Sequence, residues 1–211
     1  MNVESLKKRK KYVIILGVNK RGSKMAIFST RQEYENKIQK LLITAEEIKT
    51  AIEKAGKEID SWYTDGKPVL LVSILKGAFV FMSDLSRAIT VPHEIGFMCA
   101  KSYYSGTVSS GVVQITMDLD QDVSNYHVVI VEDIIDTGRT LNDVVKLLKG
   151  RNPLSLKVVT LLDKPERRLV EFKADLSLFT IPDLFVIGYG LDYAEYYRNL
   201  PYIAVCDPNA K

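Results

Sequence analysis

The chain has 211 residues, of which 46% are hydrophobic and 26% charged, and its formal net charge is +3. This composition is typical of one globular domain large enough to bury its own core, and the mild charge does not indicate a nucleic-acid-binding face. Two cysteines are too few for a disulfide framework, and no apolar run approaches the roughly 20 residues needed to span a bilayer.

The first 36 residues differ from the rest of the chain. A basic cluster at Lys7 to Lys11 supplies much of the positive charge, and Glu4 is the one acid within residues 1–31. We expect residues 1–36 to form a basic N-terminal extension, either disordered or a targeting segment, with an organellar transit peptide left open. Residues 37–211 should form a single domain. Cys99 and Cys206 lie in apolar runs and are interpreted as reduced core residues, which fits a cytoplasmic protein.

The following segments alternate between helical and extended patterns. Apolar residues at helical spacing run from Ile38 through Ile48, Ile52 and Ile59, which predicts a helix with Thr44 as a good N-cap. A buried strand is expected at residues 69–75, a strand of mixed facing at 95–101, further strands at 112–117 and 156–162, and a helix at residues 79–89. This alternation predicts an α/β fold with an open, mostly parallel sheet, whose ligands bind beyond the carboxyl ends of the strands.

A strand, a turn and a helix follow one another between residues 128 and 148. Val128 to Val131 is a β-branched run that suits a buried strand, and Leu141, Val144, Val145 and Leu148 recur at helical spacing. Thr140 is expected to be the helix N-cap, with Asp143 completing a capping box. Backbone N–H groups should therefore converge at this helix start, where they can bind a phosphate.

Three acids lie at the end of the same strand. Glu132, Asp133 and Asp136 fall within five residues, so their charges repel one another unless a cation or a polyol lies between them. Glu132 and Asp133 leave a strand on opposite faces, so both can reach one ligand only if the strand ends there. The alternative is a solvated strand end whose polar groups bond to the local backbone.

Other polar residues also follow apolar strands. Lys76 and Gly77 bring a positive charge and room for a close backbone approach, and Lys164 follows Leu161-Leu162-Asp163. Residues 102–110 are rich in Ser, Tyr, Gly and Thr, which predicts a mobile loop. His93 and His127 are the only histidines, and both are interpreted as structural.

Taken in order, these motifs resemble those of the type I phosphoribosyltransferase family, and within it of the enzymes that act on hypoxanthine and guanine. The resemblance extends from about residue 38 to residue 206. It is carried by residues 132–140, 75–77, 102–103, 162–165 and 185–193, followed by Arg198 in a tyrosine-rich segment expected to be helical. The family fold implied is an open, mostly parallel sheet flanked by helices, with a small hood formed by the N- and C-terminal segments.

The resemblance implies a purine salvage enzyme. Such an enzyme transfers the 5-phosphoribosyl group of 5-phosphoribosyl 1-pyrophosphate (PRPP) to hypoxanthine or guanine, giving IMP or GMP and pyrophosphate. It further implies Mg2+ as cofactor and a homodimer or homotetramer, with no nucleic-acid or membrane partner. Whether xanthine is a substrate is left open.

The resemblance also implies a role for each matched residue. Asp136 would be the general base near purine N7, and Ser102 and Tyr103 would belong to the lid. PRPP and its 5'-phosphate would be bound by Glu132, Asp133, Asp136, Thr137, Gly138, Arg139 and Thr140. Mg2+ would be held by Glu132, Asp133 and Asp192. The pyrophosphate would meet Lys76, Gly77 and Arg198, and the purine would meet Lys164, Phe185, Val186 and Asp192.

Two other functions fit the sequence less well. A regulator with the same fold, sensing PRPP and binding nucleic acid, would be favoured by the basic N-terminus alone. Retention of Asp136, Lys164 and Asp192 argues against it. A dehydrogenase is disfavoured because no Gly-x-Gly-x-x-Gly follows a strand.

Overall fold

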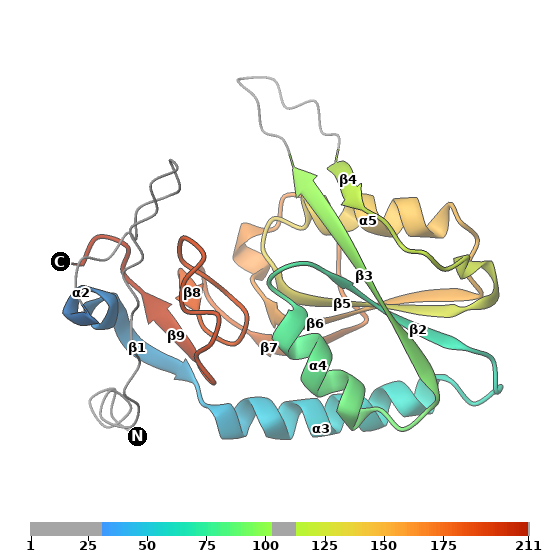
Figure 1. The fold of residues 1–211 in the computed structure, drawn as a ribbon, viewed down its shortest axis with the longest axis horizontal. Helices are drawn as coiled ribbons and strands as arrows, with labels where there is room; N and C mark the ends of the chain where they lie inside the picture. The colour runs from blue at the N-terminus through green and yellow to red at the C-terminus, as the bar shows by residue number, and fades with distance from the viewer. Residues whose placement is uncertain (1–30, 103–112, 211) are drawn as a thin grey trace, which may run out of the picture. The chain divides into compact units, whose positions relative to one another are not determined.

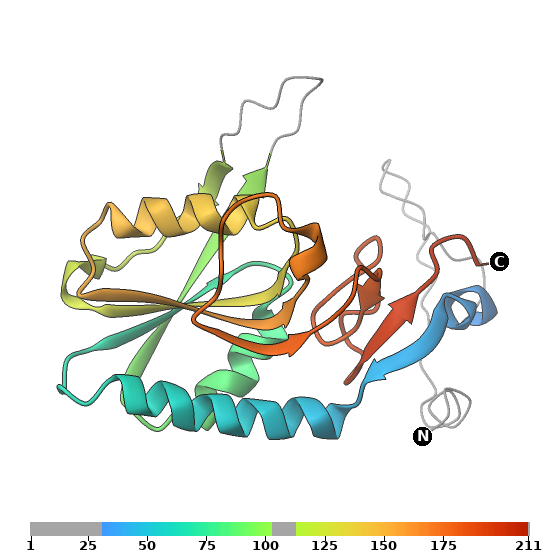
Figure 2. The ribbon, with the colours of Figure 1, turned by 180° about the vertical axis from the view of Figure 1, so that it is seen from behind.

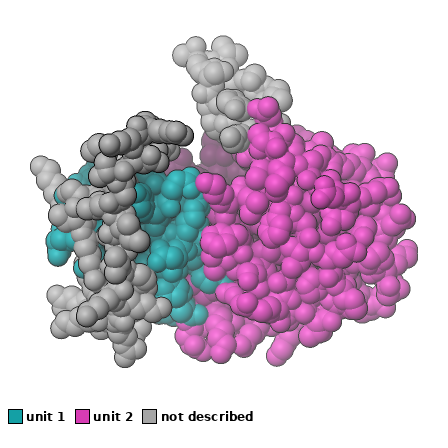
Figure 3. All heavy atoms as spheres, in the orientation of Figure 1, with its two compact units in different colours: residues 1–45, 185–211 teal, residues 46–184 magenta. Residues whose placement is uncertain are grey.

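The computed structural model describes residues 31–102 and 113–210, and Figure 1 shows their helices and strands. The chain divides into two compact units, which Figure 3 shows in different colours. Of the described residues, the smaller unit combines residues 31–45 with residues 185–210, and the larger unit contains residues 46–102 and 113–184. A small unit built from the two ends of the chain was expected from the family resemblance.

The larger unit is built on a six-stranded sheet in the order β4-β3-β2-β5-β6-β7. All neighbouring strands are parallel except β3 and β4, which are antiparallel. The predicted open, mostly parallel sheet is therefore confirmed. Its strands are β2 (Val69–Ile74), β3 (His93–Ser102), β4 (Val113–Met117), β5 (His127–Ile135), β6 (Ser155–Asp163) and β7 (Leu176–Thr180).

Helices cover both faces of this sheet (Figures 1 and 2). Helices α3 (Ala45–Trp62) and α4 (Phe79–Ala88) lie on one face, and α5 (Arg139–Lys149) lies on the other. Two short 3-10 helices, η1 (Val123–Asn125) and η2 (Pro165–Arg167), lie in connections. Because both faces are covered, β2 is buried along its whole length, and its sequence is apolar except for Ser73 rather than alternating.

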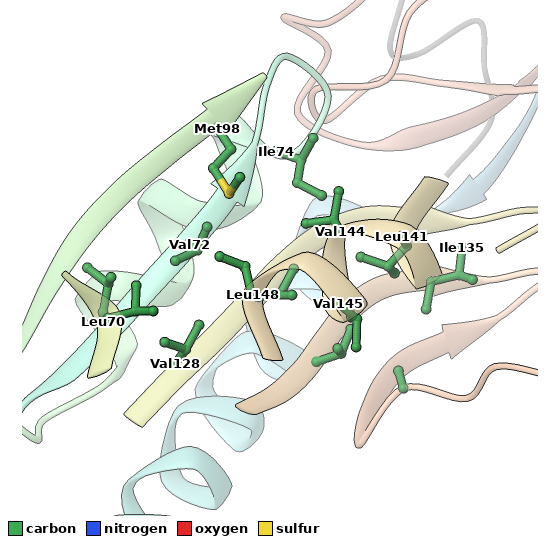
Figure 4. Packing of buried hydrophobic residues seen from close by; sticks show 14 residues of the cluster. Leu70, Val72, Ile74, Met98, Val128, Ile135, Leu141, Val144, Val145 and Leu148 are labelled. Carbon is green, nitrogen blue, oxygen red and sulfur yellow. The ribbon is translucent and has the colours of Figure 1, made fainter. Parts of the chain in front are cut away.

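The core under α5 explains the local sequence. Successive side chains of a strand point to opposite faces, so Leu70, Val72 and Ile74 share the face that meets α5. Figure 4 shows Val144 and Leu148 of α5 among these residues. The apolar stripe at helical spacing therefore fixes which face of α5 is buried, and so where the amino terminus of the helix lies.

The predicted helix from Ile38 is wrong over its first residues. Residues Ile38–Ile43 form β1, which pairs antiparallel with β9 (Ile203–Cys206), and β9 pairs with β8 (Val186–Ile187). The helix α3 begins at Ala45, directly after Thr44. Pairing with a strand some 160 residues further along the chain overrides the local pattern, and a sequence window cannot detect such a partner.

The smaller unit has a core of its own, formed by Ile38, Ile187, Tyr197, Leu200, Ala204 and Cys206. Helix α2 (Arg31–Asn36) belongs to this unit, and its Tyr34 ring stacks on Tyr197 with 4.1 Å between ring centroids. Residues 31–36 of the expected extension are thus helical. Residues 1–30 lie outside the described residues, so a boundary at residue 36 stays a prediction.

The tyrosine-rich segment before β9 is not the expected helix. Two isolated β-bridges, Gly188 to Leu191 and Tyr193 to Tyr196, shape it. Tyr189, Ala194, Glu195 and Tyr197 all have positive φ, which no right-handed helix accommodates. Elsewhere, no helix within residues 31–102 and 113–210 is both long and apolar enough to cross a membrane.

Candidate active site

Strand β5 runs further than expected. It continues to Ile135 rather than ending at Val131, because Ile134 and Ile135 pair with Leu162 and Asp163 of β6 and Ile135 is buried. Glu132 and Asp133 are therefore strand residues, and the expected bend after Val131 is absent. Both still line one pocket of about 260 Å³, together with residues that follow β2 and β5. The full lining is Ile74, Leu75, Lys76, Gly77, Ala100, Glu132, Asp133, Ile134, Ile135, Asp136, Thr137, Gly138, Thr140 and Leu141.

Glu132 and Asp133 are neighbouring carboxyl groups whose negative charges would repel each other. Burial, and then the neighbouring Asp133 carboxylate, raise the pKa of Glu132 well above its usual value. One of its oxygens, Oε2, is shielded from solvent and has no hydrogen-bond partner among the described residues. Asp133 is 8% exposed, and its Oδ1 accepts a hydrogen bond of 2.8 Å from the Ile134 N–H. A buried carboxylate oxygen without a donor, beside a second carboxylate, suits a cation.

A cation here would be only partly coordinated by protein. Within residues 31–102 and 113–210, no three His, Cys, Asp or Glu side chains gather closely enough to enclose a metal ion. Mg2+ keeps several waters and commonly takes one or two carboxylates plus substrate phosphates. Glu132 and Asp133 fit that pattern. Asp192 belongs to the other unit, and its predicted role as a third metal ligand stays a prediction.

The turn after β5 leads directly into α5. Gly138 is the N-cap of this helix with φ of +79°, a left-handed conformation that glycine adopts without strain, and the helix begins at Arg139. Thr140 is therefore inside the helix, and the predicted Thr140 cap with its Asp143 capping box is wrong. The phosphate prediction does not depend on that cap, because the positive end of the helix dipole lies at the pocket. Arg139 is exposed and does not line the pocket.

Lys76 and Gly77 reach the same pocket from β2. The strand ends at Ile74, the Leu75–Lys76 peptide bond is cis, and the Leu75 N–H donates to the Met98 carbonyl at 2.8 Å. Both predicted pyrophosphate residues of this unit therefore lie beside the acidic pair.

Lys164 follows β6, as predicted, and is 6% exposed. Its Nζ lies 3.9 Å from Oδ1 of Asp183, and Asp183 Oδ1 is also 3.5 Å from a terminal nitrogen of Arg167. The Nε of Arg167 lies 2.9 Å from Oδ1 of Asp136. The predicted general base and the predicted purine-binding lysine thus belong to one chain of ion pairs.

Arg168 connects the same region to the turn after β5, residues 136–138, which we call the phosphate loop. It forms an ion pair with Asp163 and donates a 3.0 Å hydrogen bond to the backbone carbonyl of Asp136. Leu169 N–H donates to the Thr137 carbonyl at 3.0 Å. Sequence reasoning missed Arg167, Arg168 and Asp183. The available signal was two adjacent arginines three and four residues after Lys164.

The remaining predicted contacts belong to the smaller unit. Phe185 is 47% exposed and meets Tyr193 edge-on at 5.9 Å, whereas Val186 is a buried strand residue. Asp192 Oδ1 lies 2.9 Å from a terminal nitrogen of Arg198, whose other terminal nitrogen donates to the Gly190 carbonyl at 2.8 Å. Arg198 is thus held by its own segment, and its predicted pyrophosphate contact stays a prediction.

The remaining sequence predictions concern the lid and the two histidines. Ser102 is the final residue of β3, and Tyr103 lies outside the described residues, as does the rest of the predicted lid. His127 contacts Ser155 Oγ at 2.7 Å and Asp65 at 3.1 Å from the first residue of β5, at the opposite end from the acids. His93 contacts the Val91 carbonyl at 2.8 Å. These contacts support the structural interpretation of both histidines.

Known proteins are similar to this chain in sequence and fold. Residues 39–194 match the family model described as "Phosphoribosyl transferase domain". A hypoxanthine-guanine phosphoribosyltransferase from Streptococcus pneumoniae is 51% identical over 171 residues, covering 81% of this chain and 94% of that protein. A protein of the same name from Bacillus subtilis is 50% identical over 171 residues. A solved hypoxanthine phosphoribosyltransferase from Staphylococcus aureus has a TM-score of 0.79 at 45% identity, covering 83% of this chain and 95% of that one.

Proposed function

The chain belongs to the type I phosphoribosyltransferase family, in its hypoxanthine-guanine branch, and we propose that it is a purine salvage enzyme. It transfers the 5-phosphoribosyl group of PRPP to hypoxanthine and guanine, giving IMP or GMP and pyrophosphate. The observation that carries this proposal is the single pocket that gathers the acidic pair, the start of α5 and the Lys76–Gly77 turn. We further propose that residues 37–211 act as one catalytic domain.

The pocket suits the transfer step. By analogy with glycoside cleavage, breaking the anomeric C–O bond passes through an oxocarbenium-like transition state. Glu132 and Asp133 face the ribose hydroxyls, and the Asp133 carboxylate supplies negative charge as positive charge develops on the ribose. The start of α5, with Thr137 and Thr140, holds the 5'-phosphate, and Lys76 opposes the charge of the departing pyrophosphate.

Mg2+, when bound by Glu132 and Asp133, would neutralise charge on the pyrophosphate of PRPP. The protein must keep these two acids deprotonated and adjacent to do so. Burial and the neighbouring Asp133 charge raise the pKa of Glu132, so holding the two carboxyl groups side by side is the contribution of β5 to this site.

The base side uses Asp136 and Lys164. Asp136 takes the proton from purine N7, and Lys164 donates a hydrogen bond to the exocyclic O6. Adenine carries an amino group at that position and cannot accept from an ammonium, so Lys164 selects 6-oxopurines. Phe185, Val186 and Asp192 are proposed as further purine contacts, and Arg198 as a pyrophosphate contact. Arg139 is proposed as a PRPP contact, and Ser102 and Tyr103 as lid residues.

A homodimer or homotetramer is part of the proposal. Ile95, Phe97 and Met117 are 42%, 40% and 40% exposed on strands β3 and β4. Ile95 and Phe97 are two residues apart, and Met117 pairs with Cys99, so all three lie on one face of the sheet. An apolar face at a sheet edge suits a second copy of the chain. Light scattering that shows a monomer would remove this inference.

A cytoplasmic location is also part of the proposal. Both cysteines are free, which supports it.

The test is product formation from PRPP and Mg2+ with hypoxanthine, guanine, xanthine and adenine in parallel. The intact chain should convert hypoxanthine and guanine but not adenine, and Asp136→Asn and Lys164→Ala should each lose most of kcat/KM. Arg87→Gln, an exposed ion-paired arginine on α4, is the matched control. If no base reacts although PRPP binds, the nucleic-acid-binding regulator becomes the better proposal; the relatives described above do not support it.

A further inference from the structure

Arg167 bridges two carboxylates beside the proposed purine site. Its Nε lies 2.9 Å from Oδ1 of Asp136, and a terminal nitrogen lies 3.5 Å from Oδ1 of Asp183. The Arg167 side chain is 46% exposed and extends from the end of η2, so it can change partner without moving the core. The carboxylate proposed to take the N7 proton is therefore paired with a cation.

Asp183 offers a second position for that cation. It is also the partner of Lys164, whose Nζ lies 3.9 Å away. The three ion pairs thus form a row, from Asp136 through Arg167 and Asp183 to Lys164. Asp163 and Arg168 lie nearby but are paired with each other, so they do not compete for these partners.

We propose that purine binding exchanges partners along this row and that Arg167 tunes the affinity for the base. The proposal rests on the function proposed above, in which Asp136 meets N7–H and Lys164 meets O6. The purine then takes Asp136 from Arg167 and Lys164 from Asp183. Arg167 and Asp183, already 3.5 Å apart, are left with each other, so no charge loses its partner. Arg167 is a positioning residue in this scheme, because it acts through Asp136.

The exchange predicts opposite effects for its two ends. Arg167→Gln removes the competitor for Asp136, so KM for hypoxanthine at saturating PRPP should fall about two- to fivefold, the range that exposed ion pairs reach. Asp183→Asn removes the second position and should raise that KM by a similar factor. When Arg167→Gln and Asp183→Asn are combined, KM for hypoxanthine should not rise, because no arginine remains that needs Asp183 as its second partner. Arg167→Lys, which keeps the charge, should return KM toward the wild-type value.

The experiment measures kcat and KM for hypoxanthine, and KM for PRPP, with Arg87→Gln as the control and melting temperature as the check on folding. KM for PRPP and kcat should stay within about twofold of wild type in every variant, since exposed ion pairs contribute little elsewhere. A fall in kcat without a change in KM would mean that Arg167 only holds Asp136 in place, which overturns the exchange. The exchange is also overturned if Asp183→Asn changes KM for hypoxanthine equally in the presence and in the absence of Arg167. If wild type itself does not convert hypoxanthine, the proposed function fails instead.

Discussion

Gly77 and Asp133 approach each other so closely that a β-carbon on Gly77 would lie 1.6 Å from Oδ2 of Asp133. No side chain fits there unless the carboxylate moves. The contact joins the turn after β2 to the acidic pair of β5, so the hydrogen atom of glycine is what allows both to line one pocket.

Gly77→Ala should therefore displace the Asp133 carboxylate and lower kcat/KM by about a hundredfold or more, since a misplacement of about 1 Å in a catalytic group can cost that much. Gly150→Ala is the control, because Gly150 has a helical φ of −63° at the end of α5 and lies outside the pocket. Steady-state kinetics on both variants check this. Wild-type kcat/KM in Gly77→Ala would show that Asp133 has no part in the reaction.

Glu132 should make the metal-free protein less stable as the pH rises. Its ordinary pKa is 4.5, and burial followed by the Asp133 charge raises the folded-state value well above this. Below pH 4.5 both states hold the proton. Above it, the unfolded chain releases the proton while the folded protein keeps it, so stability is lost as pH rises toward the folded-state pKa. Glu132→Gln removes this loss.

The variant should be more stable than wild type at pH 8 by about 1–3 kcal/mol, the cost of a buried polar group without a partner, and the gain should shrink toward pH 4. Urea unfolding with chelator at several pH values measures the difference. A gain that does not change with pH would mean that Glu132 is ionised in both states.

Mg2+ should offset the loss of stability that buried Glu132 causes at high pH. A cation that binds the folded protein alone raises the free energy of unfolding, and a concentration of about one hundred times Kd adds about 2.7 kcal/mol. The melting temperature of wild type should therefore rise with Mg2+ at pH 8, without any substrate. Glu132→Gln should show a much smaller rise, and Arg87→Gln the full one. Equal shifts in all three proteins would place the ion elsewhere.

The sequence predicted the parts of this site that depend on local pattern. A β-branched run followed by three acids correctly predicted β5, and apolar residues at helical spacing correctly predicted α5. Both patterns are local, because the spacing of apolar residues follows from which face of a strand or helix is buried. The two boundaries between them were wrong. Ile134 and Ile135 stay in β5 because β6 pairs with them, and Gly138 replaces Thr140 as the cap because its positive φ closes the turn.

Side-chain partners across the fold could not be predicted in the same way. The ion pairs of Arg167 with Asp136 and of Arg168 with Asp163 depend on how η2 folds back on the β5 turn. Likewise, β1 depends on a pairing with β9 that no local window contains. Periodicity identifies the elements, whereas the contacts between distant elements come from the fold itself.

Arg168 should prove to hold the phosphate loop in shape. Its guanidinium joins the Asp136 carbonyl to the Asp163 carboxylate, and a β-carbon on Gly138 would meet its Cδ at 3.1 Å. Arg168→Gln breaks the ion pair and leaves Asp163 without its cation, so the loop should loosen and KM for PRPP should rise about tenfold. That factor corresponds to about 1.4 kcal/mol, within the range for a hydrogen bond to a charged group.

The matched variant is Arg167→Gln, which removes the neighbouring arginine but leaves these loop contacts intact. It should change KM for hypoxanthine and leave KM for PRPP near the wild-type value, whereas Arg168→Gln should do the reverse. Asp163→Asn should follow Arg168→Gln, because the two residues form one pair. If both arginine variants weaken PRPP equally, the two side chains act through general positive charge rather than through their separate contacts.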